Sequence, residues 1–264
     1  MSKPYYIHLV TVGISIISNY CRNFAEEDEL KILKDDWEVC KRSTPSSRLF
    51  MNVYERVKAE PRSMSAELNA MWNYIQEKMV NEVYLYSTDT GRGEFCANQL
   101  QKYFYDEIGV RANIVKIGGF GVPSQFEEGL VNLLDKISNK ITTLKQNPNN
   151  QIYLNATGGF KPENAILYTS AALLKIDNIY YLHEELKKTV QLPLIPITLN
   201  PKYMKILKYM NNYEREHGFT PKSQFAQKYG EENLHHLKTW NLIIEENGRI
   251  KLRKWTKTIL KYIA

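Results

Sequence analysis

Short apolar runs recur through the first two hundred residues, and most of them end in a loop that contains glycine. The runs are rich in β-branched and aromatic residues, which is typical of strands. They therefore indicate a series of short buried strands separated by turns. We predict strands at 5–12, 83–86, 113–117, 151–155 and 178–182.

Between these strands, apolar residues repeat at helical spacing. One such stripe contains Phe95 and Leu100, and another extends from Phe126 to Ile137. A third begins near Pro162, a residue that suits the first turn of a helix. Because strands alternate with helices, we predict an α/β fold with a Rossmann-like, mostly parallel sheet covered on both faces.

Two segments depart from this alternation. Residues 26–80 have a largely helical and polar pattern, so we expect a helical insertion after the first strand. The insertion would cover one edge of the sheet or act as a lid. Residues 190–197 contain two prolines, which favours an edge element because proline lacks the backbone N–H that a central strand needs.

Residues 201–264 follow another pattern. Three short helical stripes precede an apolar hairpin pattern at 243–252, which has an Asn-Gly turn, and a last helix follows. Thr220 is expected to cap the second of these helices. This order of elements is typical of a winged helix, so we predict two domains, 1–200 and 201–264.

The composition is that of a globular protein, with 43% hydrophobic and 24% charged residues. No apolar run approaches the roughly 20 residues of a membrane helix, so no membrane partner is expected. The three cysteines, Cys21, Cys40 and Cys96, are scattered, which argues against a disulfide framework and favours a cytoplasmic location. His235 and His236 have no third ligand at a suitable spacing, and no metal or cofactor is predicted.

The net charge of +6 is distributed unevenly. Residues 201–264 contain 13 basic and 6 acidic residues, whereas residues 1–200 contain 22 and 23. A basic winged helix favours DNA binding. However, the helix expected to enter the groove carries Glu231 and Glu232, so dimerisation or covering of a ligand is the alternative. The side chains that would contact DNA phosphates are Lys238, Arg249, Lys251, Arg253 and Lys254.

Four loops at the predicted carboxyl ends of the strands are rich in glycine and hydroxyl groups. Ligands of open α/β sheets bind at that edge, and glycine amides, hydroxyls and helix N-termini suit phosphate or another anion. Taken singly, each loop is also what a tight strand-to-helix turn requires. The chain has neither G-x-G-x-x-G spacing nor a Walker motif, which disfavours a nicotinamide enzyme or a P-loop phosphatase. The loops are residues 11–15, 87–93, 118–121 and 155–161.

Together these loops resemble the CRISPR-associated Rossmann-fold (CARF) domain family over about residues 5–200. The most specific element is Thr-Gly-Gly-x-Lys at 157–161, and Thr-Val-Gly-Ile-Ser at 11–15 is moderately specific. Ser-Thr-Asp-Thr at 87–90 and the helix start at 126–133 support the resemblance. The branch that the chain most resembles holds small ring nucleases and their regulator-like relatives.

The resemblance implies a homodimer that binds cyclic oligoadenylate, the second messenger of type III CRISPR antiviral defence, across its two-fold face. In ring-nuclease members, a serine of the first loop and the lysine of Thr-Gly-Gly-x-Lys matter for cleavage, and these correspond to Ser15 and Lys161. The function implied is therefore a hydrolase or lyase that linearises cyclic tetra-adenylate. The further ligand-binding candidates are Thr11, Gly13, Ile14, Thr88, Asp89, Thr90, Arg92, Gly119, Phe120, Asn155, Thr157, Gly158, Gly159 and Phe160.

The nucleophile of such a reaction lies in the substrate, because a ribose 2′-OH attacks its own 3′-phosphate and leaves a 2′,3′-cyclic phosphate. No metal is required if the protein holds the reacting atoms in line. Lys161 would stabilise the developing charge, and Ser15 with amides near Gly13 and Gly158 would hold the phosphate. Alternatively, Lys161 is a solvated or salt-bridged lysine, and Ser15 caps the first helix.

The remaining candidates also have two interpretations each. Asp89 and Arg92 would contact ribose or phosphate, or would pair with each other. Phe120 and Phe160 would stack on adenine, or would belong to the core.

Two other functions stay open from the sequence. One is a winged-helix transcription regulator that responds to cyclic oligoadenylate, and the other is a sensor whose C-terminal part engages a partner protein. The resemblance also bears on a third function, since effector ribonucleases related to this family carry an R-x(4–6)-H motif. Arg215 and His217 are too close together to form one.

Overall fold

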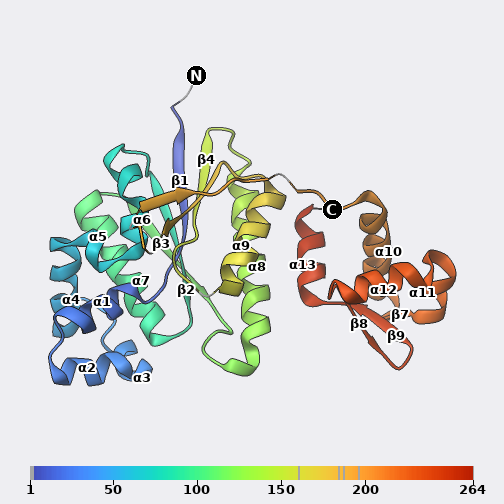
Figure 1. The fold of residues 1–264 in the computed structure, drawn as a ribbon, viewed down its shortest axis with the longest axis horizontal. Coiled ribbons are helices and arrows are strands. Elements are labelled where there is room, and N and C mark those ends of the chain that lie inside the picture. The colour runs from blue at the N-terminus through green and yellow to red at the C-terminus, as the bar shows by residue number, and fades with distance from the viewer. Residues whose placement is uncertain (1–2, 160, 184, 187, 196, 264) are drawn as a thin grey trace.

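A computed structural model describes residues 3–159, 161–183, 185–186, 188–195 and 197–263. Its centre is a six-stranded sheet with the order β3-β2-β1-β4-β5-β6 (Figure 1). The first five strands are parallel, and β6 pairs antiparallel with β5 at one edge. The predicted α/β fold with a mostly parallel sheet is confirmed. The strands are β1 Tyr5–Thr11, β2 Glu82–Thr88, β3 Arg111–Ile117, β4 Asn150–Asn155, β5 Asn178–His183 and β6 Lys188–Gln191.

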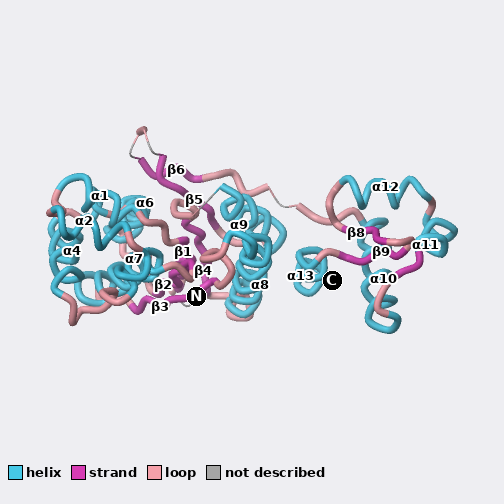
Figure 2. The backbone as a smooth tube through the Cα atoms, turned by 90° about the horizontal axis from the view of Figure 1, so that it is seen from below, coloured by secondary structure: helices cyan, strands magenta, loops and turns pink. Residues whose placement is uncertain are grey.

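Helices cover both faces of this sheet, as Figure 2 shows. On one face, apolar side chains of β1 and β2 pack against the helices between those strands and against α7, which follows β2. The predicted insertion at 26–80 is therefore helical, and it forms much of this covering layer rather than only an edge. These helices are α1 Ser15–Asn23, α2 Glu27–Lys34, α3 Asp36–Cys40, α4 Arg48–Ala59, α5 Pro61–Met64, α6 Ala66–Gln76 and α7 Gly91–Tyr103.

Two longer helices, α8 Phe126–Leu144 and α9 Lys161–Leu174, cover the other face. Their buried stripe includes Leu133, Ile137 and Leu167, which pack on apolar side chains of β1 and β4. Pro162 lies in the first turn of α9, as predicted. Two short elements complete this part of the chain, the π-helix η1 Phe104–Ile108 after α7 and the 3-10 helix η2 Pro123–Gln125 before α8.

The sheet buries an aromatic cluster around His8, whose side chain is fully buried on β1. Its Nε2–H donates to the Met79 carbonyl at 2.9 Å, and its Nδ1 accepts from the Tyr180 hydroxyl at 2.7 Å. Tyr74 and Tyr153 pack against the imidazole ring. Burial disfavours the charged imidazolium and lowers the pKa of His8 to about 4.

The C-terminal residues have a hydrophobic core of their own, formed by the side chains of four helices and a small sheet. The order helix, helix, helix, hairpin matches the prediction, and the hairpin turns at Asn247 and Gly248, both with positive φ. Thr220 does not cap a helix, which corrects the prediction, because it pairs with Ile250 in the sheet. The elements are α10 Pro201–His217, β7 Thr220–Pro221, α11 Lys222–Tyr229, α12 Glu231–Thr239, β8 Ile243–Glu246, β9 Arg249–Leu252 and α13 Lys254–Ile263.

Helix α13 packs along α8, so the C-terminal elements lie on the far side of α8 and α9 from the sheet (Figure 1). Charged side chains cross this contact. Arg253 pairs with Glu127, Lys254 with Glu128, and Lys261 with Asp135, which also accepts a hydrogen bond from Tyr262. Among the described residues, no helix has the length and apolar character needed to cross a bilayer.

Candidate functional site

The strand order reverses between β1 and β4. From β1 the chain continues to β2 and β3 on one side of the sheet, and from β4 it continues to β5 and β6 on the other side. This is the switch point at which ligands of open α/β sheets bind. The predicted loops 11–15 and 155–161 meet there. Thr11 is buried and joins them, since its Oγ1 donates to the carbonyl of Gly158 at 2.8 Å and lies 3.2 Å from that of Asn155.

Glycine is required at position 158 by the close approach of these two loops. A Cβ atom on Gly158 would lie 2.4 Å from the Thr11 carbonyl oxygen and 2.5 Å from the Gly13 nitrogen. Both atoms belong to the backbone and cannot move aside as a flexible side chain would. The Thr-Gly-Gly motif therefore places the loop after β4 directly against the loop after β1.

The first residues of the β4 loop are held in place by their own hydrogen bonds. The buried Asn155 side chain accepts from the backbone N–H of Thr157 and from its hydroxyl. The Thr157 hydroxyl in turn accepts from the Leu182 N–H on β5 at 3.0 Å. These two predicted ligand-binding side chains therefore use their polar atoms to fix the loop.

A residue that the sequence did not single out, Glu67, lies at the centre of this junction. It comes from the N-terminal turn of α6 and is 2% exposed. Its Oε1 accepts from the N–H of Gly13 at 2.8 Å, and its Oε2 accepts from the hydroxyls of Ser15 at 2.9 Å and Ser65 at 2.8 Å. The Gly13 amide and the Ser15 hydroxyl, both expected to face a phosphate, thus donate to a carboxylate of the protein.

Ser15 is half-buried and is the first residue of α1, whereas the N-cap position belongs to Ile14. The predicted capping role of Ser15 is wrong, because the residue lies inside α1 and its hydroxyl donates to Glu67 instead of accepting from an N–H of its own helix. The same oxygen accepts a hydrogen bond from the Ala66 N–H at 3.1 Å. Ile14 itself is 43% exposed beside it.

Lys161 begins α9 and its side chain is exposed. Within the part of the chain that the structure describes, it has no hydrogen-bond or ion-pair partner. The preceding Gly159 is exposed, with φ of 90°, and a Cβ there would meet the Glu163 carboxylate at 2.2 Å. Phe160, the aromatic candidate for adenine stacking, lies outside the described residues.

The second predicted loop is held by internal bonds. The hydroxyls of Thr88 and Thr90 lie 2.8 Å apart, and Thr90 also caps α7 through the Gly93 N–H. Arg92 does not pair with Asp89, one of the two alternatives from the sequence. It pairs with Asp36 of α3, whose carboxylate also accepts from the N–H groups of Gly91 and Arg92.

Asp89 instead organises the third loop. Its carboxylate accepts from the N–H groups of Gly119, Phe120 and Gly121 at 2.8–3.1 Å. Phe120 is half-buried and packs edge-on against Phe126 at the start of α8. The amides of this loop therefore donate to a carboxylate, as the Gly13 amide does.

Three of the predicted loops share a small cavity at the same edge of the sheet. It is lined by Thr11, Thr88, Phe120 and Glu163, together with the buried Tyr86. The structure thus brings together the candidates from loops that are far apart in the sequence. No group of three His, Cys, Asp or Glu side chains that could hold a metal ion is present among the described residues.

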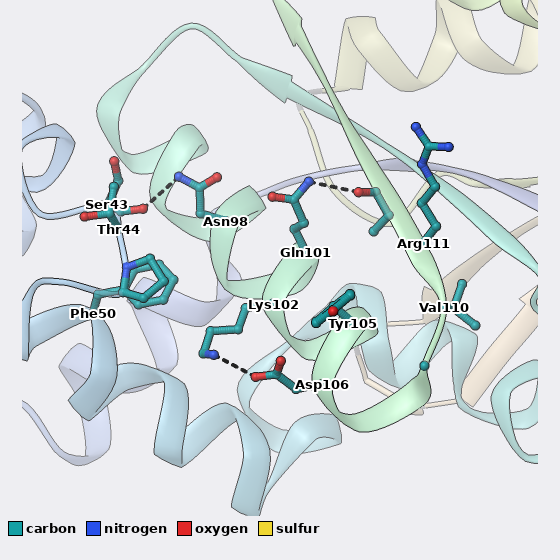
Figure 3. Close-up of a pocket in the computed structure, with 13 residues that line it drawn as sticks. Ser43, Thr44, Phe50, Asn98, Gln101, Lys102, Tyr105, Asp106, Val110 and Arg111 are labelled. Atoms are coloured by element: carbon teal, nitrogen blue, oxygen red, sulfur yellow. Dashed lines mark hydrogen bonds and ion pairs between the residues drawn. The ribbon is translucent and has the colours of Figure 1, made fainter.

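A larger surface cavity, of about 810 Å³, lies elsewhere (Figure 3). It is bordered by the loop before α4, by α7 and by Arg111 and Ala112 at the amino end of β3. Gln101 of α7 donates to the Ala112 carbonyl there, and Lys102 pairs with Asp106. None of the predicted site residues lines this cavity, so it and the predicted site are separate features.

Comparisons with known proteins identify the chain's family. Protein VC1899 from Vibrio cholerae is 10% identical, with a TM-score of 0.38 over 98% of this chain and 66% of that one. Can2 from Sulfobacillus thermosulfidooxidans, solved in complex with cyclic tetra-adenylate, is 11% identical, with a TM-score of 0.33 over 98% and 57%. This chain thus spans less than two thirds of either protein. The model of the CRISPR-associated protein family Cas_APE2256 matches residues 62–195, and the chain belongs to that family.

Proposed function

We propose that this protein binds cyclic tetra-adenylate as a homodimer and cleaves it without a metal ion, and that it thereby ends type III CRISPR signalling. The observation that carries the proposal is the junction of the loops 11–15 and 155–161 at the switch point. This junction presents a half-buried Ser15 at one edge of the sheet, together with an exposed Lys161 that is unpaired among the residues the structure describes. Membership of a CRISPR-associated family supports the biological setting.

The chemistry needs few protein groups. A ribose 2′-OH loses its proton as it attacks the adjacent phosphorus, and the bond from phosphorus to the 5′-oxygen breaks. The 5′-oxygen takes up a proton and leaves as a hydroxyl, and the other end carries a 2′,3′-cyclic phosphate. Lys161 would sit beside the phosphate, where its ammonium group stabilises the charge that develops on the non-bridging and leaving oxygens. The rigid loop after β4, fixed by Asn155 and Thr157, supplies the constant position that in-line attack requires.

The homodimer follows from the symmetry of the ligand. A ring of four equivalent nucleotides presents its phosphates in symmetry-related positions, whereas one chain carries one Lys161. A two-fold dimer would present two copies of the same junction to one ring. Light scattering with and without the ligand measures the mass of the complex, and a ring bound to a single chain would contradict this part of the proposal.

The alternative of a DNA-binding regulator has less support from the charges. Of the five basic side chains predicted to contact DNA, three are ion-paired within the protein, namely Lys238 with Glu245, Arg253 with Glu127 and Lys254 with Glu128. Arg249 stacks on Phe219, and Lys251 is exposed. A salt-dependent DNA-binding assay with and without cyclic tetra-adenylate separates the regulator from the nuclease.

The direct test is incubation of the protein with cyclic tri-, tetra- and hexa-adenylate in EDTA, followed by product analysis with mass spectrometry. We expect linear products with 2′,3′-cyclic phosphate ends from the tetra-adenylate ring. Tight binding of the ring without any linear product, at every enzyme concentration, would favour a sensor. Products that form only after a divalent cation is added would overturn the metal-independent mechanism.

A further inference from the structure

We propose that Glu67 is a positioning residue that makes Ser15 a hydrogen-bond acceptor toward the ligand, so that Ser15 receives the O–H of a ribose 2′-hydroxyl rather than donating to a phosphate. The inference rests on the proposed function, because it assumes that a cyclic oligoadenylate occupies the switch point. It adds a residue from the helical insertion to the site and gives Ser15 a defined partner on the substrate.

The first step is a count of the hydrogens at Ser15. A serine hydroxyl has one hydrogen to donate and two lone pairs to accept with. The hydrogen is used by Glu67 Oε2 at 2.9 Å, and one lone pair is used by the Ala66 N–H at 3.1 Å. What Ser15 has left for a ligand is therefore one acceptor position. A phosphate oxygen, which only accepts, finds no donor there.

The second step is the strength with which Glu67 holds this arrangement. Hydrogen bonds to a charged acceptor are about twice as strong as those between neutral groups. The Glu67 carboxylate is almost fully buried and is fixed by two further donors, the Gly13 N–H and the Ser65 hydroxyl. A buried charge that lost one of its donors would be destabilised, so the Ser15 hydrogen stays directed at the carboxylate.

The third step concerns charge. A carboxylate behind the Gly13 amide repels a phosphate, so this half of the junction disfavours the phosphate and favours a neutral donor such as a hydroxyl. The exposed Lys161 lies on the other half and attracts the phosphate. An O2′–H that donates to Ser15 keeps a lone pair of the 2′-oxygen free to face the phosphorus. The two halves thus suit the two reacting groups of one nucleotide.

The test compares Glu67→Gln with the wild-type protein, because glutamine keeps the shape but presents an N–H₂ group that can donate to Ser15 and turn its hydroxyl outward. Two readouts are measured. One is the single-turnover cleavage rate of cyclic tetra-adenylate, and the other is the affinity ratio between this ring and its 2′-deoxy counterpart. The matched control is Glu29→Gln, which makes the same change at another carboxylate of the helical insertion, one that accepts from the Tyr20 hydroxyl rather than from Ser15.

We expect the wild-type protein to bind the ribose ring about 10-fold more tightly than the deoxy ring, the value of one hydrogen bond. Glu67→Gln should abolish this preference and slow cleavage about 100-fold, as a misplaced group does. Glu29→Gln should keep the preference and stay within about threefold of the wild-type rate. A preference that survives Glu67→Gln, or an equal loss in Glu29→Gln, would overturn the inference.

Three further outcomes are distinguished by the same experiment. If Glu67→Gln does not fold, as judged by its thermal transition, Ser15→Ala replaces it, and this variant should also lose the preference for the ribose ring. If the wild-type protein binds the rings without cleaving them, the proposed nuclease fails, yet the affinity ratio still decides the role of Glu67. If it binds neither ring, the proposed function and this inference fail together.

Discussion

The sheet edge and the C-terminal region both collect groups that attract anions, and both use carboxylates of the protein to occupy them, but in different ways. At the sheet edge, the carboxylate of Glu67 is 2% exposed and is held by three donors of fixed geometry. At the contact between α8 and α13, the Glu127 and Lys254 side chains are 59% and 70% exposed. A buried carboxylate sets geometry, whereas exposed ion pairs are weak and are screened by salt.

The sheet edge and the C-terminal region are therefore suited to different functions. The junction at the sheet edge has fixed loops, and its Lys161 has no partner within the described residues, which would suit the proposed chemistry on a bound phosphate. In the described part of the C-terminal region, six of the 13 basic side chains lie beside carboxylates, three of which are on α8, so the surface is less basic than the composition. Variants that change geometry and variants that change only charge should therefore affect the two regions differently.

The largest effect is expected at Lys161. Lys161→Ala should slow cleavage of cyclic tetra-adenylate about 10²–10³-fold, because one donor that stabilises transition-state charge contributes on that scale. The measurement is the single-turnover rate at saturating protein. Lys188→Ala, which removes an exposed lysine from the edge strand β6, is the control and should leave the rate unchanged. A Lys161→Ala protein with the wild-type rate would remove this residue from the mechanism.

Acid should destabilise the α/β region through His8. The pKa of this buried imidazole is about 4, against an ordinary value of 6.5, so the unfolded chain takes up a proton first as the pH falls. The contribution of His8 is complete above pH 6.5 and is lost down to about pH 4, up to about 3 kcal/mol. Denaturant unfolding of the wild-type protein and of His8→Asn at several pH values measures it.

The variant is expected to be less stable at neutral pH, because the Met79 carbonyl and the Tyr180 hydroxyl lose a well-placed partner. What decides the prediction is the slope rather than the absolute value. Between pH 6.5 and 4, the free energy of unfolding should fall more steeply for the wild-type protein than for His8→Asn. Equal slopes would mean that His8 is not held in its neutral form.

Two glycine substitutions contrast steric and conformational costs in the two regions. Gly158→Ala places a methyl group 2.4 Å from the Thr11 carbonyl oxygen and should cost about 2 kcal/mol, as overpacking does. Gly218→Ala, at the end of α10, meets no atom within 4 Å and has φ of 80°, so it should cost about 1 kcal/mol. Thermal unfolding measures both, and ligand binding should be lost only in Gly158→Ala.

Most of the α/β architecture could be predicted from the sequence, because alternation of strands and helices leaves few topologies open. The loops at the carboxyl ends of the strands could be found for the same reason. Glu67 could not, because its contacts with Gly13 and Ser15 span more than fifty positions in the chain and no local spacing encodes them. A hydroxyl at a helix start indicates a cap, in which the oxygen accepts from a helix N–H. At Ser15, however, the oxygen accepts from the Ala66 N–H and the hydroxyl donates to the distant Glu67 carboxylate.

The charge of the C-terminal region shows the same limit. The sequence reveals an excess of basic residues after position 200, but not which carboxylates lie opposite them. The partners of Arg253, Lys254 and Lys261 are on α8, some 126 residues earlier in the chain. The predicted helix cap at Thr220 is wrong for the same reason, since the pairing of this residue with Ile250, thirty positions later, decides its conformation.

The smallest effect is expected when the exposed pairs at α8 are broken. The double variant Glu127→Gln and Glu128→Gln frees Arg253 and Lys254 and should cost less than about 1 kcal/mol of stability per pair. The freed cations should raise non-specific DNA affinity at low salt, with a slope of log affinity against log salt that is steeper by up to about 2. A salt titration of DNA binding measures this slope.

The matched control is the double variant Glu216→Gln and Glu246→Gln, which changes the net charge equally but releases no lysine or arginine from an ion pair. If the α8 ion pairs limit the contact of Arg253 and Lys254 with DNA, only the first variant should steepen the slope. Equal slopes in both variants would mean that net charge alone governs DNA contact. An unchanged slope in both would leave the C-terminal region as a packing partner of α8, with its charges serving the contact rather than a nucleic acid.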